Sequence, residues 1–172
     1  MADNHSSFPL LLNELSSRSK APVGQFSFWV YLWVAVIGVG AIGVWVELSR
    51  ALDAKEFDPN GIITAIYTYF PAIAAGSALQ LLMDASKEEH KFLRSFCILS
   101  AAIIIVLLLP FFRGSSNLNL LWTFGAIGVT YSLWLWWITN GNSGSFHDVH
   151  PDDTLGGDPK ESLAGDTGGF KT

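Results

Sequence analysis

Four long apolar segments dominate the sequence, at about residues 26–48, 61–83, 92–112 and 118–139. Each reaches the length of roughly 20 residues that an α-helix needs to cross the hydrocarbon core of a bilayer. Apolar residues make up 50% of the chain and charged residues 15%, and the apolar residues come in blocks rather than at a helix or strand period. The sequence therefore predicts an all-α integral membrane protein with a four-transmembrane-helix bundle.

Polar segments flank this predicted membrane domain of residues 26–139. Residues 1–25 form an N-terminal segment with a short apolar stretch, in which a helix begun at Pro9 would place Leu11, Leu12 and Leu15 on one side. Such a helix is too short to span, so it lies in the interface or docks on a partner, or else the terminus is frayed. No cleavable signal peptide is evident.

The segment at 61–83 carries small or polar residues at every fourth position: Thr64, Thr68, Ala72, Gly76 and Gln80, with Asp84 continuing the series. The hydrophobic effect does not drive helices together in lipid, so small residues and side-chain hydrogen bonds must do it. We expect this stripe to be a helix-packing seam, or alternatively the lining of a pore. Pro71 lies in mid-segment and invites a kink.

Orientation follows from the lysine and arginine residues beside the spans. One side holds Arg18, Lys20, Lys87, Lys91 and Arg94, whereas the other holds Arg50, Lys55 and Arg113. The richer side is predicted to be cytoplasmic, which places both termini in the cytoplasm. At that membrane edge Asp84 is expected to pair with Arg94 across a short polar hairpin.

The tail, residues 140–172, is rich in glycine and acidic residues and is predicted to be disordered when alone, because it cannot bury enough apolar surface. Its spaced apolar residues in an acidic field are typical of a segment that folds against a basic groove on a soluble protein, although a merely solvating tail fits equally. The predicted partner-binding residues are Phe146, Asp148, Asp152, Asp153, Leu155, Leu163 and Phe170.

The sequence carries little that points to chemistry. It has no nucleophile elbow, phosphate-binding loop, zinc-protease motif or dinucleotide fingerprint, so no enzyme activity and no cofactor are predicted. The run His147-Asp148-Val149-His150 lacks the preformed scaffold of a metal site, and no metal is predicted. No basic patch supports nucleic-acid binding. Cys97 is the only cysteine, and we expect it to be a buried apolar residue.

The Asp, Glu, Lys and Arg residues are confined to loops, the tail and the end turns of the spans. Proton relays, voltage sensors and coupled carriers place such residues deep in the bilayer, so active transport is not predicted. A passive pore stays open as an alternative if several copies line a channel with Thr64, Thr68 and Gln80.

The preferred hypothesis is a non-enzymatic membrane subunit that forms a homo-oligomer and holds a soluble cytoplasmic protein at the lipid bilayer. In topology and size the chain resembles the small four-pass membrane subunits of bacterial two-gene antiphage defence systems, the Kiwa type in particular. The resemblance implies a sensor of phage infection in the bacterial inner (plasma) membrane, working with a soluble partner that binds nucleic acid. The alternatives are a homo-oligomeric channel and an accessory or assembly subunit of a larger membrane complex.

Overall fold

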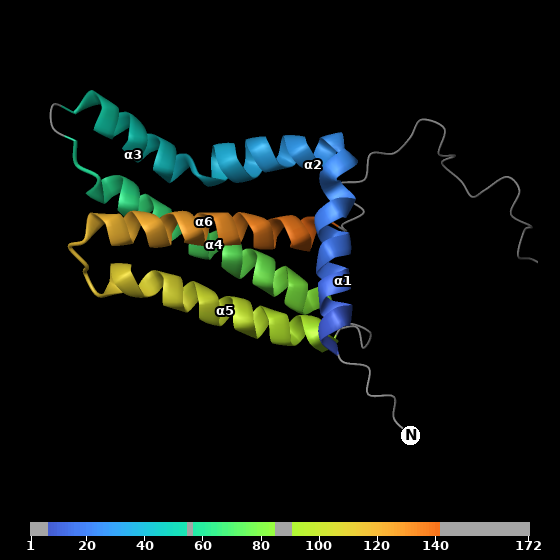
Figure 1. The fold of residues 1–172 in the computed structure, drawn as a ribbon. Helices are drawn as coiled ribbons and strands as arrows, with labels where there is room; N and C mark the ends of the chain where they lie inside the picture. The colour runs from blue at the N-terminus through green and yellow to red at the C-terminus, as the bar shows by residue number, and fades with distance from the viewer. Residues whose placement is uncertain (1–6, 55–56, 85–90, 142–172) are drawn as a thin grey trace, which may run out of the picture.

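The computed structural model describes residues 7–54, 57–84 and 91–141, and these residues form helices and no strands (Figure 1). The predicted all-α class is therefore confirmed for this part of the chain. In order, the elements are α1 Ser7–Lys20, η1 Ala21–Gly24, α2 Phe26–Tyr31, η2 Leu32–Gly40, α3 Ile42–Asp53, α4 Asn60–Asp84, α5 Lys91–Phe112 and α6 Leu118–Asn140.

Three helices, α4, α5 and α6, are each long and apolar enough to cross a membrane. They run side by side, with α4 packed against both α5 and α6 (Figure 1). Pro71 lies inside α4, which continues through it. Pro110 lies inside α5; the helix runs on to Phe112, and the chain then turns at Gly114 with a φ of 62°.

The first apolar segment is not the single helix predicted for residues 26–48. It begins as α2, widens into the π-helix η2, breaks at Ala41 (φ −90°, ψ 20°) and resumes as α3. The break falls among Gly38, Gly40 and Gly43, which favour helix less than other residues do. Among the described residues, a fourth potential span passes the same test of length and hydropathy only if the pair Leu11–Gly24 and Phe26–Gly40, bent by 93°, is counted as one.

Helix α1 lies across one end of the bundle, at a steep angle to the other helices (Figure 1). It contacts α6 and α5, and Leu11 and Leu15 pack against the main core. Leu12, predicted to share that side, is 50% exposed. We call this end of the molecule the α1 end, and the opposite end, with the connectors α3–α4 and α5–α6, the far end.

Two apolar clusters hold the helices together. The larger lies between α4, α5 and α6 and includes Tyr67, Phe70, Leu81, Leu93 and Leu135. The smaller joins the first segment to α6 through the contacts of Phe28 with Trp136 and Trp137, whose ring centroids are 5.2 and 4.9 Å away. The first segment is thus attached to α6 near the α1 end and to α4 through α3 near the far end.

Candidate functional site at the uncovered face of α4

Helix α4 has one face covered by the rest of the chain. Its covered face carries Ile63, Tyr67, Phe70, Ala74, Ser77 and Leu81, all less than 9% exposed. The Tyr67 hydroxyl donates a 3.0 Å hydrogen bond to the carbonyl of Leu121 on α6. On α6, Gly125 and Gly128 let this face approach closely, because a Cβ at Gly128 would lie 2.9 Å from the ring of Phe70.

The stripe identified from the sequence lies on the uncovered face. We call Thr64, Thr68, Ala72, Gly76 and Gln80 the α4 stripe; all of them are exposed. The hydroxyls of Thr64 and Thr68 each donate a 2.8 Å hydrogen bond to the carbonyl four residues earlier, so they need no outside partner. The α4 stripe therefore contributes little to packing within the chain. Its predicted role in packing between chains, or alternatively in lining a pore, stays a prediction.

A groove of about 570 Å³ runs between this face and the first segment. We call it the α4 groove. Most of the α4 stripe lines one wall; the other wall comes from α2 and η2, and Trp136 of α6 also lines it. Its lining is, in full, Tyr31, Ala35, Val36, Gly40, Thr68, Tyr69, Ala72, Ile73, Gly76, Ser77, Gln80 and Trp136, none of which is charged.

The far part of the groove is fixed by side chains that satisfy the backbone of η2. The Tyr69 hydroxyl reaches from α4 to the carbonyl of Val36 at 2.9 Å, and the Trp45 indole N–H donates to the carbonyl of Ile37 at 2.8 Å. A widened or broken helix leaves carbonyls without their usual amide partners, and in a membrane such groups must be paired by protein. Tyr69 and Trp45 do this here.

Polar side chains also gather where the groove approaches the α1 end. The Gln80 amide donates to the Asn140 side chain at 3.5 Å, a long hydrogen bond, while the Asn140 amide donates to the Trp136 carbonyl at 3.0 Å. Ser77 is 2% exposed, and among the described residues its hydroxyl has no hydrogen-bond partner. The sequence analysis did not identify Ser77 or Asn140 as residues of this site. The feature that could have identified Ser77 is its position directly after Gly76 of the α4 stripe.

Gly76 differs from the glycines of α6. A Cβ built at Gly76 meets nothing within 4 Å, whereas one at Gly125 or Gly128 meets side chains of α4. A glycine inside a helix costs about 0.5–1 kcal/mol relative to alanine. The cost at Gly128 is offset by close packing with Phe70, but nothing within the described chain requires glycine at position 76.

At the α1 end, helix α1 is held against the end of α6 by close packing and a hydrogen bond. Arg18 is 5% exposed and forms a 2.7 Å ion pair with Glu14 one helical turn earlier. The Trp137 indole N–H donates to the Ser19 carbonyl at 2.9 Å. Gly141 lies so close to the Arg18 carbonyl that a Cβ there would collide with it. The chain therefore leaves α6 directly beside α1.

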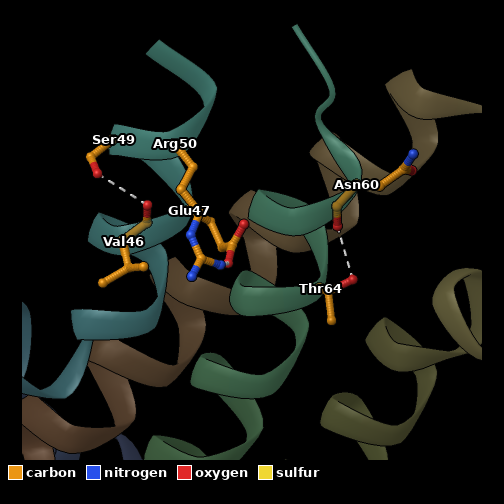
Figure 2. A network of polar contacts seen from close by, with 6 residues as sticks. All are labelled: Val46, Glu47, Ser49, Arg50, Asn60 and Thr64. Carbon is orange, nitrogen blue, oxygen red and sulfur yellow. Dashed lines mark hydrogen bonds and ion pairs between the residues drawn. The ribbon is translucent and has the colours of Figure 1, made fainter. Parts of the chain in front are cut away.

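The far end holds a polar cluster where α3 meets α4 (Figure 2). Arg50 and Glu47 form a 2.6 Å ion pair, and the Ser49 hydroxyl donates to the Val46 carbonyl at 3.2 Å. The Glu47 carboxylate also lies against Gly61, where a Cβ would collide with it. A carboxylate beside the first turn of α4 is favoured by the helix dipole and by the unpaired amides there.

The remaining predicted sites are described only in part. Arg94 is exposed, but the side chain of Asp84 lies outside the described residues, as does the hairpin between them. The predicted partner-binding tail from Phe146 to Phe170 also lies outside them. Within the described residues no group of three or more His, Cys, Asp or Glu side chains is placed to hold a metal ion.

Among the described charged side chains, those with low exposure are Glu14, Arg18 and Glu47, and all lie near the ends of the bundle. Between the ends, the described polar side-chain groups are hydroxyls, amides, indole N–H groups and the Cys97 thiol. No protein-family model, no curated protein and no solved structure matches this chain.

Proposed function

We propose that this chain is a non-enzymatic membrane subunit that crosses the bilayer four times, associates with further copies of itself, and holds a soluble protein at its α1 end. We assign the α1 end to the cytoplasm, in the bacterial inner membrane, because the lysines and arginines beside the spans concentrate there. Self-association would use the α4 stripe. The acidic tail would supply the attraction for a basic surface on the soluble partner.

The single observation that carries this proposal is the contrast between the two faces of α4. One face is buried among apolar side chains, and the other displays Thr68, Ala72, Gly76 and Gln80 along an uncharged groove. Lipid chains offer no hydrogen bonds to such a face, whereas a neighbouring protein helix packs well against small residues. A protein built for docking in the membrane accounts for this face.

Docking at the α1 end is supported by how the tail departs. Gly141 packs against the Arg18 carbonyl of α1, and the Trp137 indole N–H bonds the Ser19 carbonyl, so the end of α6 is held beside α1. A partner bound to the tail would therefore sit next to α1. Because the chain resembles the membrane subunits of Kiwa-type antiphage systems in topology and size, we propose phage sensing as its role, with a soluble nucleic-acid-binding partner.

The test is recovery of a soluble partner from detergent-solubilised native membranes, identified by mass spectrometry and then purified and rebound. Deleting residues 142–172 should abolish both recovery and rebinding, because the acidic tail is removed while the described helices stay intact. The lipid-facing variant Ile105→Ala serves as the control and should retain both. Rebinding of the purified partner to the truncated chain would contradict the proposal, and so would recovery of integral membrane proteins alone, which favours an accessory subunit.

A homo-oligomeric channel is the second candidate, favoured by the hydroxyl and amide groups of Thr68, Ser77 and Gln80 in the α4 groove. Ion flux through purified protein in liposomes, lost in Gln80→Leu, would support it. The docking proposal predicts no ion flux through such liposomes. It also predicts that truncation of the tail changes the binding of the soluble partner and nothing else.

A further inference from the structure

The first apolar segment contains a π-helix that is longer than a single turn. η2 spans nine residues, Leu32–Gly40, between the α-helical pieces α2 and α3. π-helical turns are rare, mostly interrupt α-helices for one turn, and are frequent at functional sites. The hydropathy of residues 26–48 is that of one continuous span, so a continuous α-helix is the competing structure for the same residues.

The break in this segment leaves the carbonyls of Val36 and Ile37 to be bonded by side chains. The amide of Ala41 would bond the Ile37 carbonyl in an α-helix and the Val36 carbonyl in a π-helix. It is directed instead to the carbonyl two residues earlier. The Tyr69 hydroxyl donates to the first of the two free carbonyls at 2.9 Å, and the Trp45 indole N–H donates to the second at 2.8 Å. We call these two hydrogen bonds the η2 latch.

Gly38 and Gly40 are suited to the wide turns of η2. A Cβ at either position would lie 3.2 Å from the carbonyl oxygen five residues earlier, which is the carbonyl that a π-helix brings beside it. Such a contact is tighter than most Cβ contacts in proteins, so alanine at either position crowds the π-helix. In an α-helix, by contrast, alanine is the most favourable residue. Alanine at these positions therefore favours the continuous α-helix over η2.

The two ends of the first segment are held unequally. In α2, Phe28 is completely buried and its ring packs against Trp136 and Trp137 of α6. Helix α3 has no buried residue, and its Glu47 carboxylate lies against Gly61 of α4. A cavity of about 400 Å³ lies between the break and helices α4 and α6. Helix α3 therefore has room to move while α2 stays in place.

We infer that the first segment is a two-state hinge. One form is the broken helix held by the η2 latch, and the other is a continuous α-helix in which backbone amides bond the Val36 and Ile37 carbonyls and the latch is released. Rewinding the wide turns rotates α3 about its axis relative to α2 and withdraws Glu47 from α4. Because α2 is attached near the α1 end and α3 near the far end, the hinge links the two ends of the molecule. The inference goes beyond the proposed function and does not depend on self-association.

Distances between pairs of spin labels test the hinge, in the purified full-length protein reconstituted in lipid nanodiscs. The labels are attached to cysteines in a Cys97→Ala background. The pair Leu52→Cys and Phe112→Cys measures the position of α3 relative to α5. The pair Phe26→Cys and Ile98→Cys measures the position of α2 relative to α5. All four positions are 72–77% exposed, so the labels do not disturb the core.

Two chemically different variants should populate the same second form. Tyr69→Phe removes one bond of the η2 latch, and the double variant Gly38→Ala, Gly40→Ala crowds the wide turns. Each should reduce the population at the wild-type 52–112 distance and add one second distance, the same in both variants, while the 26–98 distance stays unchanged. Tyr131→Phe and Gly43→Ala are the matched controls and should give the wild-type distances.

A 52–112 distance that is unchanged in both variants would overturn the inference. A second distance that appears in only one variant, or that differs between the two, would also overturn it, because it would indicate local loosening rather than a shared second form. A change in the 26–98 distance would show that α2 detaches from α6, which contradicts a hinge that moves α3 alone.

Discussion

Single glycines in this chain have different roles, according to what lies beside them. Gly125 and Gly128 are buried between α6 and α4, Gly61 and Gly141 make room for Glu47 and for the Arg18 carbonyl, and Gly43 and Gly76 face open space. The sequence predicts that small residues allow helices to approach each other. It does not predict which glycines serve contacts within the chain, because that depends on which face each neighbour covers.

The glycines of α6 yield a prediction about stability. Gly128→Ala would place a methyl group 2.9 Å from the ring of Phe70, which is completely buried and has no room to move. Overpacking of this kind costs about 1–3 kcal/mol, so the melting temperature in detergent should fall. Gly43→Ala, where nothing lies within 4 Å, is the control and should melt like the wild type. Equal melting of all three proteins would contradict the described packing of α4 against α6.

Burial of individual residues was harder to predict than the helices themselves. In a soluble helix the buried face is the apolar one, but in a membrane helix lipid and protein core are equally apolar, so hydropathy does not tell them apart. Ser77 is buried, and Leu79, two residues later, is 61% exposed. For the same reason, the sequence identifies the α4 stripe but does not show that the rest of the chain leaves this stripe exposed.

At the scale of elements, the broken first segment depends on contacts that no local sequence pattern records. Tyr69 lies 33 residues from its partner Val36, and their bond exists only once α4 lies beside η2. The sequence shows the glycines that weaken the helix near residues 38–43, but the position and form of the break are set by these tertiary hydrogen bonds.

Removing the Tyr69 hydroxyl should loosen η2. In Tyr69→Phe the Val36 carbonyl loses its side-chain partner in a region where water is scarce, so amide hydrogen exchange across residues 32–40 should accelerate. Tyr131→Phe removes a hydroxyl that bonds Ser100 instead, and should leave exchange in η2 unchanged. Unaltered exchange in Tyr69→Phe would show that this hydrogen bond does not hold η2.

The docking of helix α1 on α6 should depend on the hydrogen bond that the Trp137 indole donates. Trp137→Phe removes the bond to the Ser19 carbonyl, worth about 0.5–1.5 kcal/mol, while it keeps a ring to pack against Phe28. We expect residues 7–20 to exchange faster and to become more sensitive to protease. Trp134→Phe, on the same helix but with its ring against Phe96 and Tyr131, is the matched control. Protection of α1 that is equal in both variants would contradict its docking on α6.

At the scale of the whole molecule, hydropathy predicts three of the long helices but does not specify a function. The segments at 61–83, 92–112 and 118–139 correspond to α4, α5 and α6, because a run of about 20 apolar residues has few structures open to it. The predicted docking tail lies outside the described residues, and partner identity depends on a surface of another protein. The α4 groove arises from two segments far apart in the sequence, so it required the structure.

The proposed function requires four crossings of the bilayer, by the first segment from α2 to α3 and by α4, α5 and α6, with α1 on one side and both far-end connectors on the other. Substituted-cysteine labelling in intact and permeabilised cells measures this directly, with Lys20→Cys, Ala54→Cys and Ser116→Cys in the Cys97→Ala background. These positions are all exposed, at the α1 end, the α3–α4 connector and the α5–α6 connector. We predict that a membrane-impermeant maleimide labels positions 54 and 116 in intact cells and position 20 only after permeabilisation. Labelling of position 54 from the same side as position 20 would contradict the four-span account.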